Sequence, residues 1–280
     1  MESLAKLSRF ASKVRRHADI RPRPVTYVGE GRLLARTIYG TRMFLDARDI
    51  VITPIIALKG YWEPELGDYI RSYLRPGMTF VDVGANMGYF SCLAAARVGP
   101  TGRVVAYEAD PEVHAFLVDN LSLNWATSWT EAVNAAVWSE ARTLTLHRRG
   151  KYKGNTSVAK IGDDALLRCL DTSEAFDVRA APLDELIPHG VVPDLVKIDV
   201  EGAEPWVLRG IAAAMSGQRK PTLLVEWSPD QIRDCGGDPS EVANFARLNR
   251  LRMSVLENGP AEVSPDALDS IPHATLVIGG

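Results

Sequence analysis

From Glu63 onward, short apolar runs alternate along the chain with longer stretches in which apolar residues recur at helical spacing. A near-continuous apolar run predicts a strand covered on both faces, as in a parallel sheet. The alternation therefore predicts an α/β fold with a doubly wound sheet of seven strands and helices on both faces. The predicted strands are Thr79–Val83, Arg103–Tyr107, Glu131–Val133, Leu195–Ile198, Thr222–Val225 and a closing antiparallel pair, Arg252–Leu256 with Ala274–Ile278.

Turn signals separate these strands from the predicted helices. Pro76 with Gly77, and Gly99 with Pro100, end two helical stretches, because proline lacks an N–H and glycine adopts turn conformations that other residues avoid. A hairpin-like stretch is predicted after the third strand, at Ala136–His147. The predicted helices are Glu65–Leu74, Tyr89–Val98, Pro111–Leu123 and Glu204–Met215.

A basic amphipathic helix is predicted near the start of the chain, in residues 2–17. Apolar residues recur there at helical spacing, and lysines and arginines surround them. Such a helix packs its apolar stripe on its own domain or on a partner subunit, or it lies on a membrane surface. Because the stripe is short, we favour packing, and a homodimer through the N-terminal region is one form of it.

The residues after this helix have β character. The Arg-Pro repeat at 21–24 predicts an extended linker, and residues 27–56 alternate in short β-like pieces with glycine turn signals. We therefore expect two domains. Residues 1–58 form an appendage, a basic helix with a β-rich cap that covers a cleft, and residues 59–280 form the main α/β domain.

Composition limits the classes of partner. A net charge of −3 over 280 residues gives no general attraction to nucleic acid or to an anionic membrane. No apolar run approaches the about 18 residues of a membrane-spanning helix, and we expect no signal peptide. The three cysteines lack Cys-x-x-Cys spacing, which predicts buried, reduced thiols in a cytoplasmic protein.

The segment Phe80–Ser91 carries the most informative signal. Its apolar strand runs directly into a glycine-containing turn and then a helix, which lets a ligand approach the backbone at the carboxyl edge of a sheet. It lacks the Lys-Ser/Thr pair of a P-loop, and Gly84 and Gly88 do not form G-x-G-x-x-G. We therefore predict a nucleoside ligand whose tail carries no phosphates, with S-adenosylmethionine (SAM) as the candidate.

Polar side chains follow the predicted parallel strands, at the edge where such sheets bind ligands. Glu108 ends the second strand, and its two carboxylate oxygens suit the two hydroxyls of a ribose. Asn134, after the third strand, suits an adenine edge. Together the strand ends predict a SAM pocket; in chain order they carry Asp82, Glu108, Asn134 with Ala135, Asp199 and Glu226.

Four motifs make the chain similar to a known family. They are GYWEPE at 60–65, FVDVGANMGY at 80–89, VVAYEADP at 104–111 and VKIDVEGAE at 196–204. In combination they resemble the FkbM family, a branch of the class I SAM-dependent methyltransferases. The resemblance implies a Rossmann-like methyltransferase domain that methylates a hydroxyl, often on a sugar or a polyketide-like secondary metabolite.

The resemblance also implies roles for residues of these motifs. The segment that contains Asp82, Gly84 and Asn86 lines the methionine end of SAM, and Glu108 binds the ribose hydroxyls. Asn134 and Ala135 lie beside the adenine. The full predicted cofactor-binding set is Glu63, Asp82, Gly84, Asn86, Tyr89, Glu108, Ala109, Asn134, Ala135 and Asp199.

The predicted chemistry needs a base beside the transferred methyl group. An alcohol is a poor nucleophile until its proton is shared with a base. Asp199, at the end of the fourth strand, is the first candidate, and Lys197 shares its strand face and orients it. His147, after the hairpin-like stretch, is the second candidate base. Glu201 and Trp227 are expected to contact the acceptor.

Two other interpretations of these acids stay open. Asp199 and Glu201 precede a predicted helix, where a carboxylate favours the helix dipole by about 0.3–1 kcal/mol without any catalysis. Alternatively, Asp199, Glu201 and Glu226 offer the carboxylate oxygens that Mg²⁺ prefers. We do not favour a metal, because the set lacks histidine and tight ligand spacing.

The sequence thus predicts a SAM-dependent O-methyltransferase with a hydroxylated small-molecule acceptor. A nicotinamide or flavin oxidoreductase is disfavoured, since G-x-G-x-x-G is absent. One alternative is a non-catalytic module that keeps the SAM fold to bind a partner. Another is a nucleic-acid methyltransferase, which the basic residues in 6–23 favour and the mild acidity of the chain opposes.

Overall fold

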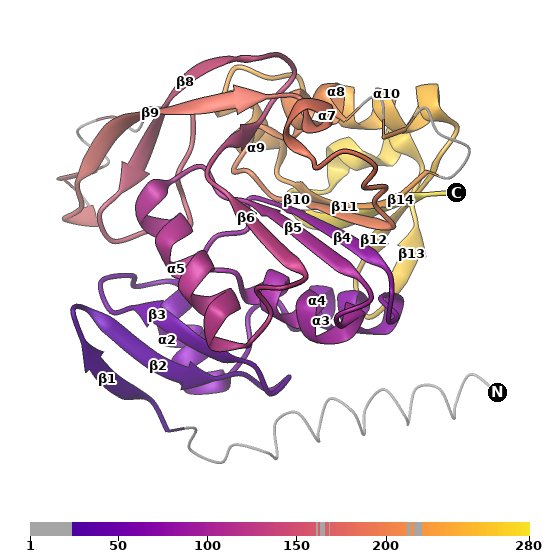
Figure 1. The fold of residues 1–280 in the computed structure, drawn as a ribbon. Coiled ribbons are helices and arrows are strands. Elements are labelled where there is room, and N and C mark those ends of the chain that lie inside the picture. The colour runs from indigo at the N-terminus through magenta and orange to yellow at the C-terminus, as the bar shows by residue number, and fades with distance from the viewer. Residues whose placement is uncertain (1–23, 161, 163–165, 168, 212–213, 216–219) are drawn as a thin grey trace, which may run out of the picture.

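A computed structural model describes residues 24–160, 162, 166–167, 169–211, 214–215 and 220–280. Its centre is an eight-stranded sheet (Figure 1) with the strand order β13 (Pro260–Glu262), β12 (Arg252–Leu256), β14 (Ala274–Gly279), β11 (Thr222–Trp227), β10 (Leu195–Ile198), β4 (Thr79–Val83), β5 (Arg103–Tyr107) and β6 (Thr130–Val133). The strands from β11 to β6 are parallel, and β14 lies antiparallel between β11 and β12.

The sheet confirms the predicted doubly wound α/β fold and corrects its size. The seven predicted strands are present, and the predicted closing pair is confirmed as the antiparallel pairing of β12 with β14. The eighth strand, β13, is a short edge strand that begins with Pro260 and is exposed throughout. No apolar run marks such a strand in the sequence, and the predicted count of seven is therefore wrong by one.

Helices cover both faces of the sheet, because successive strand residues point to opposite sides. Phe80 and Leu195 belong to one core cluster, and their neighbours Val81 and Val196 belong to the other. The first face carries α3 (Pro64–Tyr73), α4 (Tyr89–Val98) and α5 (Pro111–Leu123), and the second carries α7 (Leu183–Leu186), α8 (Glu204–Gly210), α9 (Pro229–Asp234) and α10 (Ser240–Asn249).

The predicted helices α4 and α5 are confirmed residue for residue. Both begin at a clear signal: α4 follows Gly88, and α5 follows Asp110, whose side chain accepts a hydrogen bond from the N–H of Glu112. The predicted helix at 204–215 is shorter, since α8 ends at Gly210. A Cβ at Gly210 would lie 2.0 Å from the carbonyl oxygen of Trp138, so this end of α8 packs directly on neighbouring backbone.

The N-terminal region has a separate antiparallel sheet, β1 (Thr26–Gly29), β2 (Arg32–Arg36) and β3 (Arg42–Asp46), followed by α2 (Ile52–Lys59). The predicted β pieces are confirmed as far as Asp46, but β structure over 52–56 is wrong, because these residues begin α2. A proline is tolerated in a first helical turn, and Gly60 ends the helix with its N–H bonded to the carbonyl of Ile56. The predicted basic helix at 2–17 and, except for Pro24, the predicted linker at 21–24 lie outside the described residues.

An insertion between β6 and β10 forms a third sheet, in the order β7 (Ala136–Val137), β9 (Ser173–Ala181) and β8 (Arg142–Arg149). The predicted hairpin at 136–147 is wrong, because β8 pairs with β9. Strand β9 was not predicted, although Phe176, Val178 and Ala180 alternate there with polar residues. In Figure 1 the β8–β9 pair and the β1–β3 sheet lie on opposite sides of α5.

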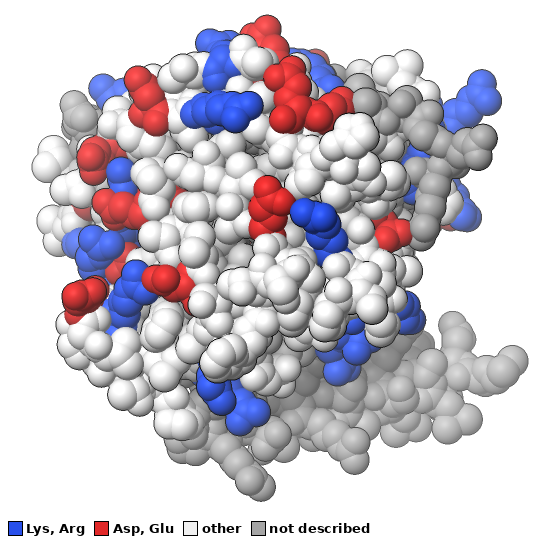
Figure 2. All heavy atoms as spheres, in the orientation of Figure 1, with Lys and Arg blue, Asp and Glu red and all other residues white. Residues whose placement is uncertain are grey.

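The surface of the described residues carries both signs of charge. Figure 2 shows lysine and arginine interspersed with aspartate and glutamate over the upper and left-hand parts of one face. No helix in the described part of the chain is long and apolar enough to cross a membrane. All three cysteines are free; Cys92 is buried as predicted, whereas Cys169 is exposed.

Candidate active site

A cavity opens at the carboxyl ends of β4, β5, β10 and β11, the edge at which the sequence predicts ligand binding. Three parts of the chain form its wall: the loops after these strands, the N-terminal region and the insertion. The apolar wall contains Met43, Ile52, Ile56, Trp138, Leu144, Leu146 and Val158. The polar wall contains Glu63, Asn86, Glu108, Lys153, Thr156, Ser157, Lys197, Asp199, Glu201 and Glu226.

The turn after β4 brings backbone to the cavity wall. Gly84 has a φ of 77°, and its N–H donates to the carbonyl of Tyr107 at 3.0 Å. A Cβ at Gly84 would lie 1.8 Å from the carbonyl oxygen of Asp199, so the contact between these two strand ends requires glycine. Asn86 also has a positive φ, 52°, a conformation that asparagine tolerates better than most residues. Gly84 and Asn86 therefore shape the turn, and both line the cavity.

The carboxyl group of Glu108 is fixed by backbone donors. Its Oε2 accepts from the N–H of Asn86 and its Oε1 from the N–H of Asp110, each at 2.8 Å. Burial raises the pKa of Glu108 to about 7, against the two backbone hydrogen bonds, which lower it. Each carboxylate oxygen accepts more than one hydrogen bond, so both retain acceptor capacity at the cavity wall.

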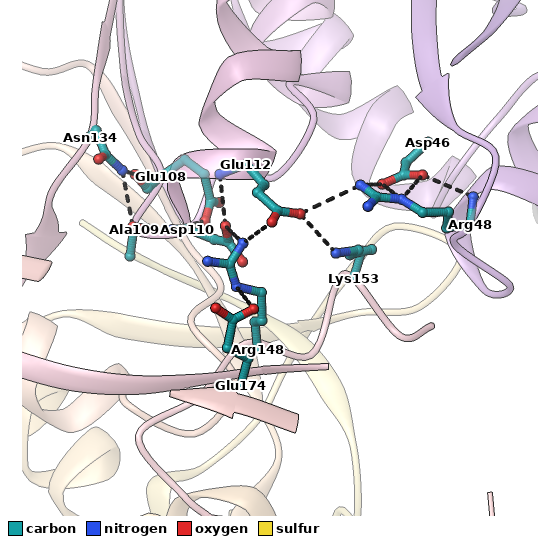
Figure 3. Close-up of polar contacts among 10 residues, drawn as sticks. All are labelled: Asp46, Arg48, Glu108, Ala109, Asp110, Glu112, Asn134, Arg148, Lys153 and Glu174. Atoms are coloured by element: carbon teal, nitrogen blue, oxygen red, sulfur yellow. Dashed lines mark hydrogen bonds and ion pairs between the residues drawn. The ribbon is translucent and has the colours of Figure 1, made fainter. Parts of the chain in front are cut away.

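Asn134 supports this turn and does not line the cavity. Its Nδ2 donates to the carbonyl oxygens of Glu108 and Ala109, at 2.8 and 3.0 Å (Figure 3). Ala109 and Ala135 do line the cavity. The structure thus brings Glu108 and the two alanines together at the wall and leaves Asn134 exposed outside the cavity.

A cluster of charges joins the outer parts of the wall to the start of α5 (Figure 3). Arg148 of β8 forms ion pairs with Asp110 and Glu112 at 3.3 and 2.7 Å. Lys153 and, from the N-terminal region, Arg48 also pair with Glu112, at 3.2 and 3.5 Å. Burial alone would raise the pKa of Glu112, but the hydrogen bond from Lys153 and the surrounding cations lower it. Glu112 is therefore a charged link between three parts of the chain.

Lys197 connects the acids on the opposite side of the cavity. Its Nζ lies 3.1 Å from Asp199 Oδ2 and 3.4 Å from Asp82 Oδ1, and it donates to the carbonyl of Gly84 at 3.1 Å. Burial alone would lower the pKa of Lys197, but the charges of Asp199 and Asp82 outweigh it and raise the pKa. The ammonium group therefore stays charged, and it orients carboxylates as the sequence predicts.

Asp82 lies beneath the cavity wall. It is fully buried, pairs in register with Lys197 across β4 and β10, and accepts a hydrogen bond from the hydroxyl of Ser91 at 2.6 Å. Burial raises its pKa, and Lys197 opposes that shift. Asp82 is not part of the cavity lining, whereas Tyr89, at the start of α4, is. Asp82 thus fixes Lys197 and α4 from behind.

Acidic side chains gather where β10 and β11 end. Glu63, Asp199, Glu201 and Glu226 all line the cavity there. Burial and the charge of Asp199 raise the pKa of Glu63 to about 7 and that of Glu201 to about 8. The same two causes raise the pKa of Glu226 well above its usual range. Glu201 is also held by Gln231, whose Nε2 donates to its Oε2 at 2.6 Å.

Trp227 and His147 lie away from the cavity, in contrast to their predicted roles at the acceptor and as a base. Trp227 is fully buried in the core on the other face of the sheet, and its Nε1 donates to the carbonyl of Ile271 at 2.8 Å. His147 lies within β8, and its backbone pairs with that of Ser157. The structure brings neither side chain to the acids at the ends of β10 and β11.

Glu226 lines the cavity; the sequence placed it at a strand end of the predicted pocket and among the possible metal ligands, but gave the acceptor contact to Trp227. Glu226 directly precedes Trp227, and because side chains alternate along a strand, only one of the two faces the cavity. Both faces of β11 are buried, so apolar residues occupy both sets of positions and do not show which face is which. In the described part of the chain, no group of three or more His, Cys, Asp or Glu side chains is arranged to hold a metal ion.

Known proteins are similar to this chain in sequence. A family model described as Methyltransferase FkbM domain matches residues 82–252, more than half of the chain. Methyltransferase sdnD of Sordaria araneosa is 31% identical over 176 residues, which are 55% of this chain and 68% of that protein. A protein-L-isoaspartate O-methyltransferase of Triticum aestivum is 36% identical over 61 residues, but these are only 22% of this chain and 26% of that protein.

Solved structures give more distant similarities. A SAM-dependent O-methyltransferase from Thermotoga maritima aligns with a TM-score of 0.44 at 13% identity, covering 93% of this chain and 87% of that one. Precorrin-6y C5,15-methyltransferase from Geobacter metallireducens aligns with a TM-score of 0.43 at 14% identity, covering 77% and 87%. The assignment rests on the family model, which spans the cavity from β4 to β11, and on the sdnD relative. The chain belongs to the FkbM family of methyltransferases.

Proposed function

We propose that this protein transfers the methyl group of SAM to a hydroxyl of a small molecule, such as a sugar or a polyketide-like secondary metabolite. The position of Asp199 carries the proposal. Its carboxylate is part of the cavity wall and is held by Lys197 at 3.1 Å. A fixed carboxylate beside a bound methyl donor suits the removal of a hydroxyl proton during transfer.

The residues at the ends of β4 and β5 fit SAM. We assign Glu108 to the ribose hydroxyls, because both of its oxygens keep acceptor capacity. The small side chains of Ala109 and Ala135 leave room for the adenine, and the turn at Gly84 lets the methionine part approach backbone. The carboxylate of Asp199, at the end of β10, favours a positive charge beside it. When bound, SAM supplies a methyl group that its positive sulfur has already activated.

Lys197 acts through Asp199 in this proposal. As a buried cation shared by Asp82 and Asp199, it keeps the Asp199 carboxylate in one orientation. It does not serve as a base, because its pKa is raised. Holding the acceptor oxygen in line with the transferred group and excluding water supplies about 7–11 kcal/mol in favourable reactions.

The acceptor lies, we propose, between the acids and the apolar wall. Glu201 binds one of its polar groups, and the methyl transfer point is beside Asp199. Met43 and Ile56, together with Ile52, cover this space from the N-terminal region, which supports the predicted role of that region as a cap. The expected acceptor therefore has a hydroxylated end and an apolar part.

Transfer of a labelled methyl group from SAM to a panel of hydroxylated sugars and polyketide-like compounds tests the proposal. The Asp199→Asn variant should lose transfer and still bind S-adenosylhomocysteine (SAH). The matched control is Asp269→Asn, at an exposed aspartate, which should transfer normally. A normal rate in Asp199→Asn contradicts the assignment of the base. Recovery of the label on nitrogen or carbon contradicts O-methylation.

A further inference from the structure

Glu226 and Asp199 lie side by side at the cavity wall. Strands β10 and β11 are parallel and in register, with Ile198 opposite Val225, so the residues that follow them, Asp199 and Glu226, are also neighbours. By the alternation of side chains, both lie on the face that carries Lys197. Both side chains line the cavity, so any acceptor held at the methyl transfer point meets the two carboxyl groups together.

The two carboxyl groups are close enough to act on each other, since the charge of Asp199 raises the pKa of the buried Glu226. Two ionised carboxylates side by side have no donor between them and repel each other, and one proton between the two groups removes the repulsion and supplies a donor. Oε2 of Glu226 is buried without a hydrogen-bond partner among the described residues. That oxygen has no donor to stabilise a negative charge on Glu226.

The surrounding charges indicate which partner holds the proton. The ammonium group of Lys197 lies 3.1 Å from Asp199 and compensates a negative charge there. Glu226 instead faces the acids that follow β10, Glu201 and Glu204, which disfavour a further negative charge. From the other side, β14 presents Thr275 opposite Glu226, which brings no charge. The proton therefore belongs on Glu226.

We propose that Asp199 and Glu226 share one proton, which Glu226 holds before the reaction, and that Glu226 is the positioning residue for the Asp199 base. The inference rests on the proposed function. Burial, and then the charges of Asp199, Glu201 and Glu204, raise the pKa of Glu226, in agreement with the geometry.

The acceptor O–H bond breaks, and its proton passes to Asp199. An O–CH₃ bond forms while the S–CH₃ bond of the donor breaks, and that electron pair stays on sulfur. The pair then holds two protons and no net charge, and it returns one proton to water before the next cycle. The hydrogen bond that Glu226 donates occupies one oxygen of the Asp199 carboxylate. The other oxygen stays free to take the proton of the acceptor hydroxyl.

Infrared spectroscopy of the ligand-free protein tests the pair without any acceptor, because a protonated carboxyl group absorbs apart from carboxylates. We compare wild type with Glu226→Gln at about pH 7. The variant should lose the band of one protonated carboxyl group, and its Kd for SAH should stay within about twofold, because the amide donates to Asp199 as the protonated acid does. Glu262→Gln, at an exposed glutamate of β13, is the matched control and should keep the full band.

Loss of a carboxylate band in place of the protonated band would show that Glu226 is ionised and would overturn the proposal. If Glu226→Gln does not fold, Asp199→Asn tests the pair from the other side. It removes a charge that raises the pKa of Glu226, so the protonated band should titrate at lower pH; an unchanged titration overturns the proposal. Failure of wild type to bind SAH refutes the proposed function and leaves the infrared result on the pair intact.

Discussion

The two sides of the cavity hold their acids in different ways. At the end of β5, two backbone N–H groups fix Glu108, and three basic side chains surround the nearby Glu112. At the ends of β10 and β11, the carboxyl groups of Glu201 and Glu226 crowd around Asp199, with Lys197 as the contacting cation. The first side is a fixed set of acceptors suited to recognition. On the first side Glu108 alone has a pKa raised to about 7, whereas the second side gathers several carboxyl groups with raised pKa values around one candidate base, as proton transfer requires.

The largest expected effect separates chemistry from binding. Asp199→Asn should lower turnover by about 10²–10⁴-fold, the usual contribution of a general base, because the amide accepts no proton from the acceptor. The Kd for SAH should change little, since Glu108 and the turn at Gly84 are intact. Methyl-transfer rates and calorimetry on the same samples check both parts. A parallel loss of binding and turnover would mean that the two sides do not act separately.

Gly84→Ala should break both sides at once. The new Cβ would lie 1.8 Å from the carbonyl oxygen of Asp199, and Gly84 has a positive φ. Strain and overpacking together should lower the free energy of unfolding by about 2–5 kcal/mol and abolish SAH binding. Gly99→Ala is the matched control, because Gly99 also has a positive φ but open space around it. Urea unfolding of the two variants should therefore differ; equal stabilities would contradict the close contact.

Glu108→Ala should damage the cofactor side alone. It removes an acceptor of the ribose hydroxyls and leaves two backbone N–H groups without their partner, so SAH should bind about 10–100-fold more weakly. Calorimetry against Glu262→Ala, an exposed control on the same sheet, measures the effect. Unchanged SAH affinity would place the ribose elsewhere in the cavity.

The smallest expected effect is a pH dependence of stability. The folded-state pKa is about 7 for Glu63, Glu108 and Glu204 and about 8 for Glu201, all above the usual 4.5. Between about pH 4.5 and about pH 8, the folded protein thus binds more protons than the unfolded chain. Its free energy of unfolding should therefore fall as the pH rises through this range. Denaturant unfolding of the ligand-free protein at about pH 6 and about pH 8 checks this. Glu201→Gln should flatten the slope, and a stability that rises over the same range would contradict the raised values.

The sequence predicted the parallel core well because local signals there agree. Strand β4 and helices α4 and α5 have the predicted bounds, since apolar runs, glycine turns and proline starts all mark the same positions. It failed at α2, where Thr53, Pro54 and Ile55 resemble an extended segment, and the helix is stabilised by packing of Ile52 and Ile56 on the core. At such positions tertiary contacts override the intrinsic secondary-structure propensity of the residues.

The candidate site was predictable where backbone turns define it and less so where side-chain direction does. Gly84 and Glu108 follow from a motif and a strand end. The sequence predicted that Trp227 contacts the acceptor, but Glu226 is the residue that lines the cavity. The difference depends on which face of β11 meets the cavity, and the sequence of a strand buried on both faces does not show this. Asp82 is fully buried behind the wall and Asn134 is exposed outside it, and spacing along the chain encodes neither position.

Calorimetric titration of the purified protein with SAM and, separately, with SAH, in the presence of EDTA, tests the central claim most directly. The account predicts saturable binding of both ligands, since Glu108, the turn at Gly84 and the surrounding acids form the site without a metal. A folded sample that binds neither ligand would contradict it.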